Sequence, residues 1–139
     1  MKRVTGIGGL FFKAKNDPQQ LNEWYEKHLG LNYKDSGGYP VWAWRPYNAP
    51  EKTGETVFSI FKNSSGYFGN PDQQFMINFR VANLEELIEV LRQEGVKITG
   101  EIQSFDYGKF AWIEDPDGNR IELWEAAEVT GFNGGMPME

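Results

Sequence analysis

The sequence predicts an α+β protein in which two βαβββ modules form a cupped mixed sheet with helices on its outer face. Two helices carry the same signature, a capping residue followed by an apolar stripe of helical spacing, at Asp17 and again at Asn83. Strand-like runs flank each helix in the same order, one before it and three after it. Five turn-forming residues, 115–119, separate the last two runs and imply an antiparallel pair. We therefore expect an internal duplication within a single domain, residues 1–126.

The first module is expected at about residues 4–62. Its first strand, 7–14, alternates so that Leu10 and Phe12 share one face. The following helix begins with Pro18 after the Asp17 cap and ends at Gly30. Three more strands are expected, at 31–36, 41–45 and 56–61.

A linker at 63–72 is expected to connect to the second module at about residues 73–126. Asn83 and Glu86 form a capping box that starts its helix, and Gly95 ends that helix. The expected strands of this module are 75–81, 97–102, 109–114 and 120–125. Residues 127–139 show little periodicity and are expected to form a flexible C-terminal tail.

The amino-acid composition excludes several classes of binding partner and site. The formal net charge of -6 argues against nucleic-acid binding, because no cluster of lysine or arginine exists to neutralise phosphates. The chain has no cysteine, which excludes disulfides and thiolate metal sites. It shows neither a signal peptide nor an apolar run long enough to span a membrane. A cytoplasmic protein with a small-molecule ligand is the expectation.

The paired modules and two sequence phrases resemble one protein family. The phrases are Trp24-Tyr25-Glu26-Lys27-His28-Leu29-Gly30-Leu31 on the first helix and Asp115-Pro116-Asp117-Gly118-Asn119-Arg120-Ile121-Glu122-Leu123 near the end. Over roughly residues 4–126 the chain resembles the vicinal oxygen chelate superfamily. That superfamily includes glyoxalase I, extradiol dioxygenases, epimerases, fosfomycin-modifying enzymes and metal-free bleomycin-binding proteins. The resemblance therefore implies the fold and leaves the reaction open.

The resemblance also implies where a metal would bind. In metal-dependent members, ligands lie on the first strand of each module, and a glutamate lies on the last strand. Glu122 matches the glutamate. The position on the first strand of the first module falls on Gly9, or on Leu10 if one extra residue near Asn16 is counted. The position on the first strand of the second module falls on Met76. Glycine and leucine side chains bind no metal, and a thioether suits hard cations poorly. We expect a degenerate metal site without a cofactor; the alternative is a divalent metal held partly by Glu122.

The concave face of the sheet is expected to carry the remaining site residues. Alternation places Glu122 on the face opposite Ile121, and it places Asn78 and Arg80 on the face opposite the core. The family's pairing of the first strand with the last would bring Asn78 or Arg80 beside Glu122, where either could neutralise the carboxylate. A solvated ion pair is an equally open interpretation.

Aromatic residues are expected to line the same face and make an aromatic cup. Those on the alternate positions are Trp42, Trp44, Phe58, Phe110 and Trp112, while Tyr67 and Phe68 lie in the linker. Such rings more often form core or a dimer interface than a ligand platform. Because so many rings on one face would expose a large apolar area, we expect two chains to associate as a homodimer. For a ligand platform, tryptophan faces favour flat or cationic molecules.

The leading prediction for function follows from these features. It is a glyoxalase-like or bleomycin-resistance-like protein that binds a small organic molecule, with Glu122, Arg80, Asn78, Trp42, Trp44, Phe58 and Trp112 as ligand-binding residues. The alternative is a metal-dependent lyase or dioxygenase of the same superfamily that uses Glu122 as a metal ligand. A third class is a structural protein that keeps the fold for dimerisation.

Overall fold

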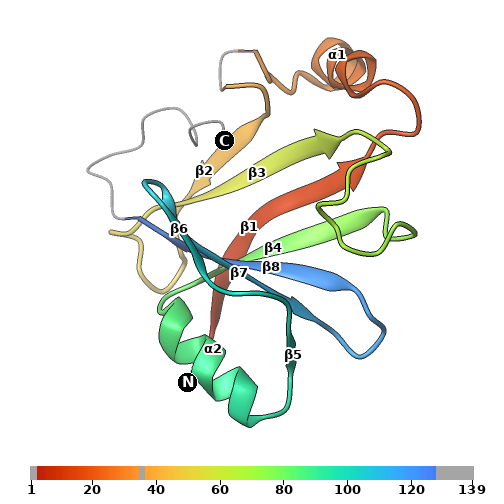
Figure 1. Ribbon diagram of the computed structural model, residues 1–139. Helices are drawn as coiled ribbons and strands as arrows, with labels where there is room; N and C mark the ends of the chain where they lie inside the picture. Colours follow the sequence, from red (N-terminus) through yellow and green to blue (C-terminus); the bar gives the residue numbers. More distant parts are fainter. Residues whose placement is uncertain (1–2, 35–36, 128–139) are drawn as a thin grey trace.

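A computed structural model describes residues 3–34 and 37–127 of the chain. Over these residues the elements are β1 (Val4–Lys13), α1 (Pro18–Leu29), β2 (Val41–Trp44), β3 (Gly54–Phe61), β4 (Phe75–Val81), α2 (Leu84–Gln93), β5 (Lys97–Ile98), β6 (Gln103–Phe105), β7 (Gly108–Glu114) and β8 (Arg120–Ala126). The strands form one sheet in the order β2-β3-β1-β4-β8-β7-β5, with β6 paired to β7. Figure 1 shows the sheet curling between α1 at one end and α2 at the other. The predicted α+β class with a cupped mixed sheet is confirmed.

The two modules meet at β1 and β4, which pair antiparallel at the centre of the sheet. β3 runs parallel to β1, and β8 runs parallel to β4, so each module adds its last strand to its own first strand. The expected pairing of the first and last strands of the second module is thereby confirmed. Among the residues that the structure describes, no helix is long and apolar enough to cross a membrane.

Both helices begin where the sequence predicts. The side chain of Asp17 accepts a hydrogen bond from the backbone N–H of Gln19 (3.0 Å), and that of Asn83 accepts one from Glu86 (3.2 Å). Such caps satisfy N–H groups that have no partner within the helix. α1 ends at Gly30, which adopts a left-handed φ of 73°.

Two strand predictions are wrong. Residues 31–34 of the predicted strand 31–36 form no strand, and residues 35 and 36 lie outside the described residues. The N–H of Gly38 instead bonds the carbonyl of Tyr33 (2.8 Å), which turns the chain before β2. The predicted strand 97–102 ends after Ile98, because Gly100 takes a left-handed φ of 84°, and an unpredicted short strand, β6, follows. The predicted tail from residue 128 onward lies outside the described residues.

The hydrophobic core lies under α2. Leu84, Leu87, Ile88 and Leu91 of this helix pack against Val81, Ala111 and Leu123 of the sheet. α1 has no fully buried residue, and its Tyr25 instead meets the rings of Phe12 and Phe58. The second module is therefore anchored to its helix more firmly than the first.

Within the described part of the chain, part of the outer face of β1 and β4 lies uncovered between the helices. Four apolar side chains there are 39–68% exposed: Ile7, Leu10, Phe75 and Ile77. Leu10 lies directly opposite Ile77 across the two strands. This face is apolar and continuous over both modules.

The turn at 115–119 fixes the register of β7 and β8. Oδ1 of Asp115 accepts hydrogen bonds from the backbone N–H groups of Asp117 (3.0 Å) and Asn119 (2.9 Å), and Oδ2 accepts one from the Asn119 amide (3.0 Å). Gly118 adopts the left-handed φ of 82° that the tight connection needs. The resulting register places Glu122 opposite Trp112.

These bonds predict an acid-sensitive contribution to stability. The hydrogen bond from the Asn119 side chain, followed by the backbone N–H bonds, lowers the pKa of Asp115 below its ordinary value. A lowered folded-state pKa stabilises the fold above the unfolded-state pKa, and this stability is lost as pH falls through the folded-state value. We expect Asp115→Ala to lower Tm at pH 7 and to differ less from the wild type near about pH 3.

Thermal unfolding followed by circular dichroism at both pH values tests this expectation. Asp117→Ala is the matched control, because it removes an exposed carboxyl from the same turn. A Tm difference for Asp115→Ala that is the same at both pH values contradicts the assignment.

Candidate functional site

Four strands align a row of residues across the concave face. Gly9 of β1 is opposite Asn78 of β4, Asn78 is opposite Glu122 of β8, and Glu122 is opposite Trp112 of β7. Residues directly opposite one another in a sheet point to the same face. The register therefore brings Asn78 and Trp112 to either side of Glu122.

Glu122 is a buried carboxylate with three hydrogen-bond donors. Its side chain is only 2% exposed. Oε1 accepts from Nδ2 of Asn78 (2.5 Å), and Oε2 accepts from Nε1 of Trp112 (2.9 Å) and from the hydroxyl of Tyr67. Donors to a carboxylate compensate for the loss of water that burial causes. The two neighbouring strands and the linker thus hold this carboxylate in one orientation.

Tyr67 lies in the predicted linker and was not among the predicted site residues. Phe68 next to it is completely buried, with the ammonium of Lys13 5.3 Å from the centre of its ring. The guanidinium of Arg120 also donates to the backbone carbonyl of Tyr67 (3.2 Å). These contacts fix the linker against the sheet and direct the Tyr67 hydroxyl to Glu122. Two adjacent aromatic residues within a segment of small and polar residues were the available signal.

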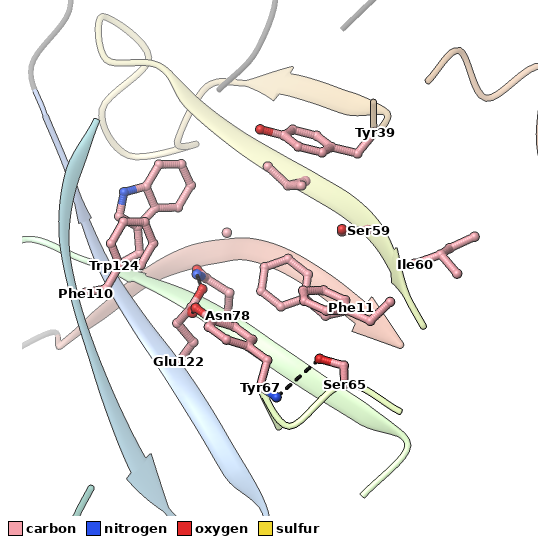
Figure 2. A pocket seen from close by; sticks show the side chains of 13 residues that line it. Phe11, Tyr39, Ser59, Ile60, Ser65, Tyr67, Asn78, Phe110, Glu122 and Trp124 are labelled. Atoms are coloured by element: carbon pink, nitrogen blue, oxygen red, sulfur yellow. Dashed lines mark hydrogen bonds between the residues drawn. The ribbon is translucent and has the colours of Figure 1, made fainter. Parts of the chain in front are cut away.

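A cavity of about 400 Å³ lies on the concave face beside Glu122. Its lining is predominantly aromatic and apolar, with a few polar groups (Figure 2): Gly8, Phe11, Tyr39, Val57, Ser59, Ile60, Phe61, Ser65, Tyr67, Asn78, Phe110, Glu122 and Trp124. None of these described lining residues is a lysine, arginine or histidine. A cavity of this size and character suits a small organic molecule.

Two stacked pairs of rings contribute to the walls of the cavity. Phe110 and Trp124 are almost parallel, at 7° and 5.7 Å between ring centres, and Phe61 and Tyr67 are likewise stacked, at 10° and 5.5 Å. Figure 2 shows Phe11 across the cavity from Phe110 and Trp124, with Glu122 and Asn78 between them. The walls therefore offer flat surfaces on which a planar ring could stack.

The predicted placement of Trp42 and Phe58 on the concave face is wrong. The ring of Trp44 lies 5.9 Å from the Arg80 guanidinium and is not among the residues that line the cavity. In β3, Val57 lines the cavity, so its neighbours Thr56 and Phe58 point to the opposite face. Trp42 is paired with Thr56, and Nε1 of Trp44 donates to Oγ1 of Thr56 (2.8 Å). The ring of Phe58 meets Tyr25 of α1 at 5.2 Å. The parallel register of β3 on β1 sets this outcome, because it turns Val57, Ser59 and Phe61 inward.

Arg80 has a different carboxylate partner from the one predicted. Its Nη1 lies 2.6 Å from Oε2 of Glu55, and its guanidinium lies 4.7 Å from the centre of the Trp124 ring. Both charged side chains of this pair are largely buried, at 14% and 16% exposure. Of the two residues proposed as neighbours of Glu122, the structure places Asn78 there.

The donor set beside Glu122 does not fit a divalent metal of the kind the family resemblance implies. Gly9 offers no side chain, and Met76 lies opposite Phe11, one alternate position away from the row that contains Glu122. Across residues 3–34 and 37–127, no three His, Cys, Asp or Glu side chains come together. The remaining neighbours of Glu122 are an amide, an indole and a phenol, which are donors or weak metal ligands.

Comparisons with known proteins place the fold. No curated protein matches the sequence. The structure is similar to methylmalonyl-CoA epimerase from Mycobacterium tuberculosis, with 21% identity, a TM-score of 0.59 and 92% of both chains covered. It is also similar to the epimerase from Streptomyces coelicolor in complex with 2-nitronate-propionyl-CoA, with 14% identity, a TM-score of 0.66 and coverage of 92% of this chain and 99% of that chain. A catechol 2,3-dioxygenase matches with 12% identity and a TM-score of 0.53 over 95% of this chain and 44% of that chain.

A sequence profile gives the family directly. The profile of the Glyoxalase/Bleomycin resistance protein/Dioxygenase superfamily matches residues 11–123. This match spans both modules, from β1 to Leu123 in β8. The chain therefore belongs to the Glyoxalase/Bleomycin resistance protein/Dioxygenase superfamily.

Proposed function

We propose that this chain binds a small organic molecule in the cavity beside Glu122 and does so without a metal ion. The observation that carries the proposal is a buried carboxylate, oriented by three donors, in a cavity with aromatic walls. A few polar groups in a largely apolar cavity are the usual arrangement for fixing the orientation of a small ligand. Asn78 lies beside Glu122, as expected, and Phe110 is one of the expected rings that line the cavity. Trp112, expected as a wall, instead donates to Glu122, and the other aromatic walls are Phe11, Tyr39, Phe61, Tyr67 and Trp124.

The charge of the site favours a flat, neutral or cationic ligand. Glu122 contributes negative charge, and the described lining residues include no cationic side chain to balance an anion. A cation over an aromatic face contributes about 0.5–2 kcal/mol, and a hydrogen bond to a charged group contributes about 1.5–3 kcal/mol. Several such contacts acting together would support micromolar binding.

Replacing the carboxylate tests its role as the orienting group. We expect Glu122→Gln to weaken the binding of cationic aromatic molecules by about tenfold or more, because the amide carries no charge. Neutral aromatic molecules should lose less affinity. A screen of cationic, neutral and anionic aromatic compounds by tryptophan fluorescence measures this difference.

Glu101→Gln is the matched control for this screen, because it removes the same charge from an exposed position. A preference for anions, or cation affinity that survives Glu122→Gln unchanged, would overturn the role of Glu122. If no compound binds, the third class, a structural protein of this fold, is favoured instead.

A metal-dependent lyase or dioxygenase is the competing function within the family. The name of the similar catechol 2,3-dioxygenase suggests such a reaction, but an identity of 12% carries only the fold. The donors around Glu122 weigh against a metal, since they occupy both carboxylate oxygens. One carboxylate with an amide beside it binds divalent ions weakly.

We therefore expect the purified protein to carry no stoichiometric divalent metal after dialysis. Elemental analysis measures this, and thermal shift in the presence of added zinc, manganese, nickel or iron(II) measures weaker binding, because a ligand of the native state raises Tm. One equivalent of any of these metals that survives dialysis, and that Glu122→Gln loses, would establish the competing function.

We also propose that two chains associate through the uncovered outer face of β1 and β4. The two strands are the equivalent first strands of the two modules and run antiparallel, so the surface they share resembles a two-fold arrangement. A second copy of the chain can match such a surface with itself. The proposed dimer contact therefore rests on exposed apolar side chains of the outer face, and not on the aromatic residues of the concave face.

Light scattering at tens of micromolar concentration should give the mass of a dimer. Leu10→Asp should shift the protein to a monomer, because a carboxylate would then have to be buried in the contact. Tyr47→Asp is the control, since Tyr47 is an exposed ring outside this face. A wild-type protein that is monomeric under these conditions contradicts the proposed association.

A further inference from the structure

We propose that Asn78 accepts a hydrogen bond from the ligand, so that the cavity selects a planar ring with an N–H or O–H group at its edge. This inference rests on the proposed function, because it names the class of molecule that the same cavity takes. It adds a second recognition group to Glu122 and a chemical requirement that Glu122 alone does not impose.

The nitrogen and the oxygen of the Asn78 side-chain amide differ in their hydrogen bonding. Asn78 is 1% exposed, and its Nδ2 donates to Oε1 of Glu122 at 2.5 Å. That contact sets the orientation of the amide, because an amide oxygen in the same place would face a carboxylate oxygen. Oδ1 is buried and has no hydrogen-bond partner among residues 3–34 and 37–127. Folded proteins rarely leave a buried acceptor unsatisfied.

Gly8 determines what can approach this oxygen. A Cβ atom on residue 8 would collide with Oδ1 of Asn78 and would lie 2.9 Å from Cγ of Arg80 and 3.0 Å from Cε3 of Trp124. The register of β1 against β4 shifts between Ile7 and Gly9, so Gly8 is the extra residue of a bulge. Gly8 and Asn78 both line the cavity. Because Oδ1 is almost completely buried, a ligand donor reaches it only after a small movement of the amide, which the absent side chain of Gly8 permits.

The walls of the cavity define the rest of the ligand. The rings of Phe110 and Trp124 form a wall of the cavity close to Asn78 and Glu122 (Figure 2). A planar ring on this surface would direct one edge to the amide oxygen and the carboxylate, both of which accept hydrogen bonds. A ring with acceptors alone would leave Oδ1 unsatisfied. The volume of about 400 Å³ is sufficient for one or two fused rings.

Two small molecules that differ only in a hydrogen-bond donor measure what a donor on the ligand contributes to binding. Indole and benzofuran have nearly the same shape, and they differ in an N–H group that benzofuran replaces with an oxygen. Benzofuran is the more apolar of the two, so stacking and burial alone favour it. Protein-observed NMR titrations give both dissociation constants. We expect indole to bind the wild-type protein about five to ten times more tightly than benzofuran.

Two substitutions assign this preference to Asn78. Asn78→Leu removes the acceptor together with one donor to Glu122, and it should bring the ratio of the two affinities to about one. Trp112→Phe is the control, because it removes a different donor to Glu122 and leaves the Asn78 oxygen in place. It should keep the preference for indole. If Asn78→Leu fails to fold, Gly8→Ala tests the same point, since its methyl group crowds Oδ1.

The possible outcomes separate this inference from the function on which it rests. Equal affinities for indole and benzofuran in the wild type, or a preference that persists in Asn78→Leu or Gly8→Ala, overturn the role of Asn78 and leave the cavity as a binding site. Binding of neither probe at millimolar concentration contradicts the proposed function together with this inference.

Discussion

The burial of the Glu122 carboxylate is the constraint on which the rest of the site depends. Removing an ionised carboxylate from water costs several kcal/mol, which hydrogen-bond donors must offset. The donors come from three segments that are far apart in the sequence: Asn78 in β4, Trp112 in β7 and Tyr67 in the linker. Glu122 therefore connects the linker to the centre of the sheet. A change in any of the three donors would leave a buried charge less well compensated.

The same arrangement supports the proposal that the site keeps the family's glutamate without a metal. The places next to Glu122 are taken by groups that donate hydrogen bonds, and Gly9 stands at the end of the row where a first-strand side chain would reach inward. Arg80 is engaged by Glu55 and is directed away from the carboxylate. In this proposal three neutral donors compensate the Glu122 carboxylate in place of a metal ion, and the space beside them is bounded by aromatic walls.

Local sequence signals predicted most of the fold because each rests on a short-range physical rule. The caps at Asp17 and Asn83 and the turn at Asp115 all act within a few residues, and each lies where the sequence indicated. The strand predicted at 31–36 had suitable residues, but residues 31–34 pair with no strand, because the turn closed by the Gly38–Tyr33 hydrogen bond leads the chain into β2. A strand depends on its partner, and this information is not local.

The site was predicted only in part for the same reason. Alternation within one strand correctly separated Glu122 and Asn78 from the core, but the choice of face for Trp42 and Phe58 needed the register of β3 on β1. Tyr67 reaches Glu122 across 55 residues of sequence, through a linker whose path is set by the buried Phe68. No spacing rule connects such positions, so only the three-dimensional structure brings them together.

A crystal structure of the protein grown with indole tests the central claim most directly. The account predicts a planar ring on the concave face against Phe110 and Trp124, with the Glu122 carboxylate still bonded to Asn78 and Trp112. It would be contradicted by a metal ion at about 2.0–2.2 Å from a Glu122 oxygen, or by a cavity that remains without the ring while the carboxylate has turned away from its donors.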